Sequence, residues 1–117
     1  MKSYTDLEQS RKLAEILPPE SADYCWGIDD ETLHYNSSPY PCAWKDYTCK
    51  EYYIPCWSLT ALFKLLPKSA RLEKGNATEL YRVILPVELE TSDWHIDPID
   101  ACVVMIERLC ELNLLLL

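Results

Sequence analysis

The sequence is poor in glycine, and this shortage excludes the phosphate-binding loops that depend on it. Only Gly27 and Gly75 occur among the 117 residues, and neither has a second glycine nearby. The fingerprints of dinucleotide-binding and P-loop proteins need two or three glycines at fixed spacing, because the backbone must approach the phosphates closely. We therefore expect no nucleotide-binding loop, and we expect no cofactor.

Long apolar runs are also missing. No run approaches the roughly 18 apolar residues that a transmembrane helix needs. The first residues, "MKSYTDLEQSRKLAEIL", are too polar for a signal peptide. We expect a cytoplasmic protein that does not enter a membrane, and in that reducing compartment its six cysteines should be mostly free thiols.

Positive charge is scarce overall. The net charge is −8, yet residues 41–75 carry six cations against three acids, whereas residues 76–117 carry eight acids against two cations. An acidic chain repels nucleic-acid phosphates and anionic membranes, so we expect no direct nucleic-acid binding. A protein that mimics nucleic-acid charge is a further alternative, and it depends on an acidic cluster that contains no lysine or arginine: Glu88, Glu90, Asp93, Asp97 and Asp100.

Closely spaced cysteine pairs are absent, which argues against a structural zinc site. Cys42, Cys49 and Cys56 are spaced by seven residues, and no C-x-x-C pair occurs. Structural zinc sites usually contain such a pair, because it directs two sulfur atoms to one point. We expect no zinc site built from these cysteines.

The stretch "SDWHIDPIDAC" places Asp93, His95 and Asp97 at every second position, as a metal site on an extended chain would. Asp97, however, directly precedes Pro98, and proline is favoured at the first position of a helix. Aspartate is favoured at the N-cap just before it, where its oxygens accept hydrogen bonds from backbone N–H groups. We therefore expect a helix start here and no metal site.

Histidine is scarce as well. His34 and His95 are the only two, neither has an identifiable nucleophile beside it, and no G-x-S-x-G elbow occurs. These absences favour a protein that is not an enzyme. The alternative is a small hydrolase or metal-binding protein that uses His34 or His95 with nearby carboxylates.

Three helices are predicted. The first covers residues 6–17, with Thr5 and Glu8 as a capping box and an inward stripe that includes Leu13 and Ala14. The second covers about residues 56–66, with Pro55 in its first turn, and is apolar enough to be buried on several sides. The third starts after Asp97, and its buried stripe is expected to contain Ile99, Cys102, Val103, Ile106, Leu109, Cys110 and Leu114.

Strands are predicted between these helices. The segment "ADYCWGI" has the composition of a strand, and residues 70–90 have the pattern of a β-hairpin with Gly75 and Asn76 at its turn. Tyr81, Val83 and Leu85 alternate with other residues, and Pro86 should end the second strand. The sequence predicts one small α+β domain over residues 1–117, with three helices packed on a small, mainly antiparallel sheet.

Aromatic residues are concentrated rather than scarce in one region. Nine of the thirteen lie between residues 24 and 57. Such rings either build the core of a chain with a single phenylalanine or form a binding surface, because tyrosine and tryptophan are common interface anchors. The second interpretation predicts a site in the irregular loop, with anchors and rim lysines as follows: Tyr35, Tyr40, Trp44, Lys45, Tyr47, Lys50 and Tyr52.

Three segments together carry a resemblance: "YTDLEQSRKLAEILPPESADYCW" at 4–26, "PCWSLTALFKLLP" at 55–67 and "DPIDACVVMIERLCELNLL" at 97–115. They resemble a group of short proteins of gut bacteria that are often carried on prophages or other mobile elements and have no assigned activity. The resemblance implies a small intracellular accessory protein that binds a host or phage protein. It agrees with the expectation of a non-enzymatic protein-binding or regulatory module.

Overall fold

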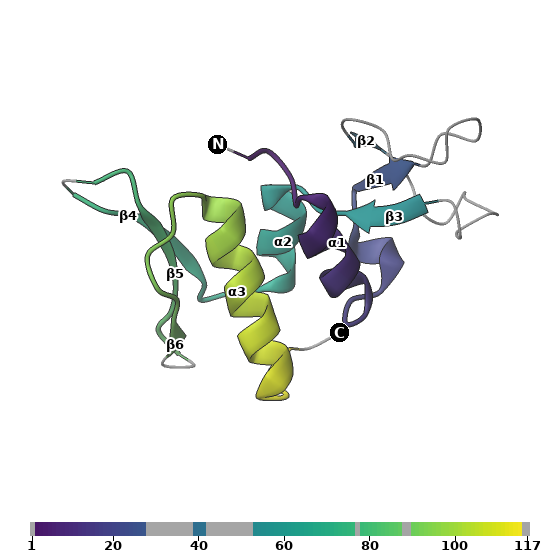
Figure 1. Ribbon diagram of the computed structural model, residues 1–117. Coiled ribbons are helices and arrows are strands. Elements are labelled where there is room, and N and C mark those ends of the chain that lie inside the picture. The colour runs from purple at the N-terminus through teal and green to yellow at the C-terminus, as the bar shows by residue number, and fades with distance from the viewer. Residues whose placement is uncertain (1, 28–38, 42–52, 77, 88–89, 116–117) are drawn as a thin grey trace.

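The computed structural model describes residues 2–27, 39–41, 53–76, 78–87 and 90–115 (Figure 1). These residues form an α+β fold, as the sequence predicts. The elements, in chain order, are α1 (Leu7–Ala14), the 3-10 turn η1 (Pro19–Ser21), β1 (Tyr24–Gly27), β2 (Tyr40–Pro41), β3 (Tyr53–Cys56), α2 (Leu59–Leu65), β4 (Arg71–Lys74), β5 (Tyr81–Leu85), β6 (Glu90–Thr91) and α3 (Pro98–Glu111).

The strands form two sheets, and the prediction of a single sheet is wrong. One sheet has the order β2-β1-β3 and the other β4-β5-β6, and every pairing in them is antiparallel. The helices lie between the two sheets in Figure 1, with α1 packed on β3 and α3 packed on β5. Each small sheet thus buries an apolar face against a different helix.

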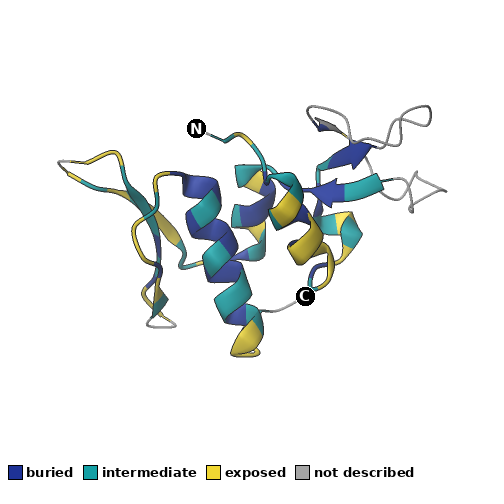
Figure 2. Ribbon diagram, in the orientation of Figure 1, coloured by how far each residue is buried: buried dark blue, intermediate teal, exposed yellow. Residues whose placement is uncertain are grey.

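Helix α3 is the centre of the core. Its side chains Ile99, Met105 and Ile106 are fully buried, and burial runs along most of its length in Figure 2. Val83 from β5 and Leu62 from α2 are fully buried in the same cluster. The amphipathic pattern of α3 therefore joins the second sheet and α2 into one apolar core.

The start of α1 differs from the prediction. Asp6, not Thr5, is the N-cap, and it forms a reciprocal capping box with Gln9. Thr5 is fully buried and is bonded elsewhere. Its backbone N–H donates to the carbonyl oxygen of Trp57, and its hydroxyl shares a hydrogen bond with the hydroxyl of Ser10. Ala14, which was expected to face inward, is exposed.

The start of α2 also differs. Pro55 belongs to β3, opposite Cys25 of β1, so it is not a first-turn residue of a helix. Ser58 caps α2 by accepting a hydrogen bond from the N–H of Ala61. Pairing between β1 and β3, which are far apart in the sequence, therefore takes precedence over the local preference of proline for a helix start.

The second half of the chain follows its predicted pattern closely. Strands β4 and β5 form the predicted hairpin, and β5 ends at Leu85, directly before Pro86. Asp97 is the N-cap of α3 and accepts a hydrogen bond from the N–H of Ile99. Within the predicted stripe Cys110 is only half-buried, and Leu114 lies beyond the end of α3 and is exposed.

Candidate functional site

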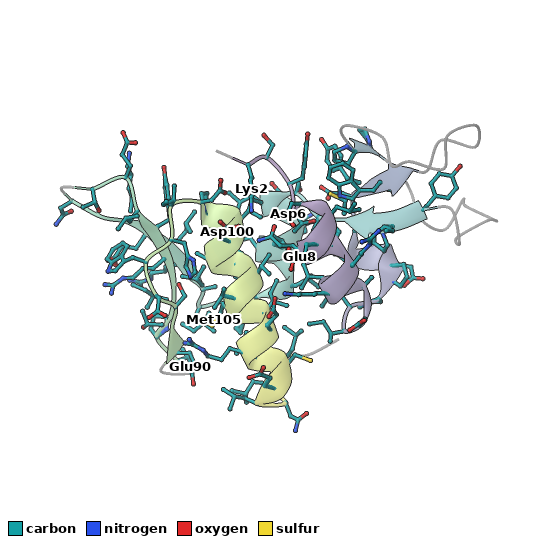
Figure 3. All side chains as sticks on the ribbon, in the orientation of Figure 1. Lys2, Asp6, Glu8, Glu90, Asp100 and Met105 are labelled. Atoms are coloured by element: carbon teal, nitrogen blue, oxygen red, sulfur yellow. The ribbon has the colours of Figure 1, made fainter. Side chains whose placement is uncertain are left out.

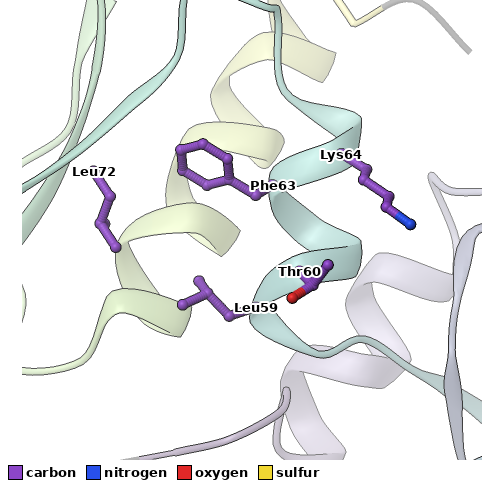
Figure 4. Close-up of a pocket in the computed structure, with 5 residues that line it drawn as sticks. All are labelled: Leu59, Thr60, Phe63, Lys64 and Leu72. Carbon is purple, nitrogen blue, oxygen red and sulfur yellow. The ribbon is translucent and has the colours of Figure 1, made fainter.

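An open groove lies between α2 and β4. Its volume is about 490 Å³, and its lining combines apolar side chains with one cation: Leu59, Thr60, Phe63, Lys64 and Leu72. Four of these residues come from α2 and one from β4, and in Figure 4 Leu72 lies across the groove from Leu59 and Phe63. A concave, largely apolar surface with a few polar groups is typical of a binding site.

The helix side of the groove follows from the spacing of its residues. Leu59 and Phe63 are four positions apart, so they share one face of α2. The buried residues Ala61 and Leu62 anchor the helix to the core. Leu59 and Phe63 lie at the margin of that core and are half-buried. Helix α2 thus has more apolar surface than the body of the protein covers.

The strand side of the groove depends on Leu72. In the β4–β5 ladder Leu72 is opposite Val83, and directly opposed residues point to the same face of a sheet. Val83 is fully buried, whereas Leu72 is 36% exposed. Leu72 is the outer member of this pair, at the edge of the sheet, and the groove is the space that remains beside it.

The segment from Lys64 to Lys74, which contributes to both walls of the groove, is rich in cations. Lys64, Lys68, Arg71 and Lys74 are all exposed, and none of the four makes an ion pair within the described part of the chain. The one acid between residues 64 and 74 is Glu73, whose carboxylate is 2.8 Å from Nη2 of Arg82. In a protein with a net charge of −8, this is a locally positive surface.

The backbone of β4 is also open on one side, because β4 is an edge strand of its sheet. The N–H of Gly75 donates to the carbonyl oxygen of Leu80, and Tyr81 exchanges two hydrogen bonds with His95 on the far side of β5. Ladder bonds alternate along a strand, so the peptide groups of Leu72 and Lys74 point away from β5. Those groups are unpaired among the described residues.

Of the binding residues predicted in the aromatic loop, only Tyr40 lies in the described part of the chain, and it does not line the groove. Tyr40 lies in β2, where it pairs with Cys25 of β1. The others lie outside the described residues, so the loop site stays a prediction: Tyr35, Trp44, Lys45, Tyr47, Lys50 and Tyr52. The sequence signal for the groove was the excess of apolar residues in α2, which we interpreted as burial on several sides.

Two of the three residues of the alternating motif, His95 and Asp97, have structural roles. Asp97 is 5% exposed, and its carboxylate accepts hydrogen bonds from the backbone N–H groups of Ile99 and Lys2. His95 pairs through its backbone with Tyr81, and its Nε2 atom is closed to solvent. Asp93 is exposed. No group of three potential metal ligands converges anywhere in the described ranges.

Two thiols in the described part of the chain have raised pKa values, so neither of them is an activated nucleophile for the histidine-based hydrolase. Burial raises the pKa of Cys102 to about 12 and also raises the pKa of Cys56. A nucleophilic cysteine needs the opposite shift, because the thiolate is the reactive form. His34, the other histidine of that alternative, lies outside the described residues.

Comparison with known proteins gives no family, curated relative or solved structure that matches this chain. Among the helices in the described ranges, none is long and apolar enough to cross a membrane.

Proposed function

We propose that this protein is a small, non-enzymatic binding module that holds a segment of a partner protein in the groove between α2 and β4. The observation that carries the proposal is the half-exposed Leu72 on the sheet, opposite Leu59 and Phe63 on the helix. Together they present apolar side chains on two walls of one open groove. A concave, mostly apolar surface with few polar groups is typical of binding sites.

A protein partner fits this groove better than a small polar substrate. The lining side chains offer only one hydroxyl, on Thr60, and one charge, on Lys64. Apolar contact at the centre with charged residues at the rim is the usual anatomy of protein interfaces. The cytoplasmic location and the phage or mobile-element context predicted from the sequence are part of this proposal.

A random peptide library provides the direct test. The wild-type protein would be used for selection, and each enriched peptide would then be measured against Leu72→Thr and Leu114→Thr. The two leucines are a matched pair, because they are 36% and 44% exposed and Leu114 does not line the groove. Threonine is favoured in strands, so it should preserve the β4 ladder at position 72.

We expect the selected peptides to bind wild type and Leu114→Thr equally and to bind Leu72→Thr much more weakly, with unchanged melting temperatures. Peptides that bind all three proteins equally would show that the groove is not the site. In that case the aromatic loop becomes the next surface to test, through the Trp44→Ala and Tyr47→Ala double variant.

A further inference from the structure

We infer that the partner segment binds as an additional strand on the free edge of β4, with apolar and acidic residues in alternation. This inference rests on the proposed function and specifies the chemistry of its partner. It goes further than the groove itself, because it assigns a role to the open backbone of β4 and to the unpaired cations beside it.

The backbone of β4 is suited to strand addition. The peptide groups of Leu72 and Lys74 point away from β5, and each offers one donor and one acceptor. An extended peptide laid along this edge would satisfy them, which is how β-augmentation supplies affinity without reading a particular sequence. The groove between β4 and α2 leaves room for one row of the added side chains.

The side chains of β4 specify an alternating partner. Leu72 lies on the face toward α2, and Arg71 lies on the opposite face. An added strand would therefore place every second side chain against Leu72, Leu59 and Phe63, where apolar groups fit. The intervening side chains would lie on the face that carries Arg71 and Glu73. Glu73 is already paired with Arg82, at 2.8 Å, so Arg71 is the charge left to attract a carboxylate across the neighbouring strands. Lys64, at the rim of the groove, would also attract an acidic segment.

A second copy of this chain is a poor occupant of the same edge. Strand β4 carries Arg71 and Lys74 against the single acid Glu73, so two copies of it would meet with the same sign of net charge. Like charges on neighbouring strands are destabilising, and charged residues on an edge strand are a common protection against self-association. The edge thus discriminates against its own copy and in favour of an acidic strand.

The test uses peptides of alternating valine and glutamate, with alternating valine and lysine as the charge control. Two backbone variants of the first peptide complete the set: one is N-methylated at its central valines and the other at its central glutamates. N-methylation removes the amide donor but keeps the side chains. Binding would be followed on isotope-labelled protein through the amides of Leu72 and Lys74 and the methyl groups of Leu59 and Leu72.

We expect the valine–glutamate peptide to shift these signals and to slow hydrogen exchange at Leu72 and Lys74, while the valine–lysine peptide does neither. One methylated variant should bind about tenfold more weakly than the other. In an antiparallel pair the valine amides face β4, and in a parallel pair the glutamate amides do, so either preference supports strand addition.

A charge reversal on the protein gives an independent check. Arg71→Glu should weaken binding of the valine–glutamate peptide and improve binding of the valine–lysine peptide. Lys12→Glu, at an exposed position of α1, should leave the binding of both peptides unchanged. If Arg71→Glu only damaged the fold, the variant would bind both peptides more weakly. A switch of preference from the valine–glutamate to the valine–lysine peptide therefore indicates recognition by charge.

Three results would overturn the inference. The first is equal binding of both methylated variants, and the second is unchanged peptide preference in Arg71→Glu. The third is the absence of any shift at Leu72 and Lys74 with the valine–glutamate peptide. If library peptides still depend on Leu72 in those cases, the proposed function stands and only the strand-addition mode is wrong.

Discussion

The ammonium group of Lys2 lies 2.8 Å from Oδ1 of Asp100, and this contact fastens the N-terminal segment to the first turn of α3 (Figure 3). The same ammonium is 3.0 Å from Oδ2 of Asp6, the N-cap of α1. The side-chain amide of Gln9 also donates to Asp100, at 2.7 Å. One lysine therefore links the starts of two helices, where carboxylates are favoured by the helix dipole.

Replacing this lysine should cost a small but measurable amount of stability. We expect Lys2→Met to lower the free energy of unfolding by up to about 1 kcal/mol, because the ion pairs are partly exposed. Lys12→Met is the matched control, since Lys12 makes only a longer contact of 3.5 Å with the exposed Glu8. Urea denaturation measures both. Equal losses would show that the network around Lys2 adds nothing beyond an ordinary surface pair.

The charge on Asp6 should make stability depend on pH in acid. Burial by itself would raise the pKa of Asp6, but the hydrogen bond from the N–H of Gln9 and the contact with Lys2 together lower it below 3.8. A lowered pKa in the folded state stabilises the protein above pH 3.8, and this contribution is lost as the pH falls through the folded value.

The Asp6→Asn variant isolates this charge, because asparagine is also a good N-cap. We expect wild type to be more stable than Asp6→Asn near neutral pH and the difference to disappear below pH 3.8. Denaturation curves at a series of pH values provide the measurement. A difference that stays constant across the acid range would mean that the carboxylate has no special partner in the folded state.

Asp97 and Asp93 provide a comparison within the alternating motif. Asp97→Ala should lower the free energy of unfolding by about 1–2 kcal/mol, because it leaves the backbone N–H groups of Ile99, at the start of α3, and of Lys2 without their acceptor. Asp93→Ala, at an exposed position, should stay within about 0.5 kcal/mol of wild type. Added zinc or manganese should leave both melting temperatures unchanged. A metal-dependent rise that His95→Ala removes would instead indicate a metal site.

The two cysteines of α3 should differ in reactivity. Cys102 is fully buried, and its pKa is raised to about 12, so almost none of it is thiolate at about pH 8. Cys110 is half-buried near the end of the helix. Under native conditions we expect iodoacetamide to label Cys110 first and Cys102 only after denaturation, as mass spectrometry of the digested protein would show. Labelling of both at one rate would contradict the burial of Cys102.

The elements that the sequence predicted well are those with purely local signals. The pair Asp97–Pro98 defines the start of α3, and Pro86 ends β5, because a proline restricts the backbone wherever the rest of the chain lies. The predictions that failed were decided at long range. Thr5 was predicted to cap α1, but its backbone bonds to Trp57 instead. Pro55 was predicted to start a helix, but it lies in β3 opposite Cys25.

The candidate groove also combines features set by local sequence with features set by long-range packing. The sequence by itself determined that α2 is rich in apolar residues, that residues 64–74 are basic and that β4 and β5 form a hairpin. Only the tertiary structure decided that α3 covers Val83 and leaves Leu72 partly open, and that β4 is an edge strand beside α2. The reason is physical: the composition of a segment fixes which side chains seek burial, whereas the packing of distant segments fixes which of them are left uncovered.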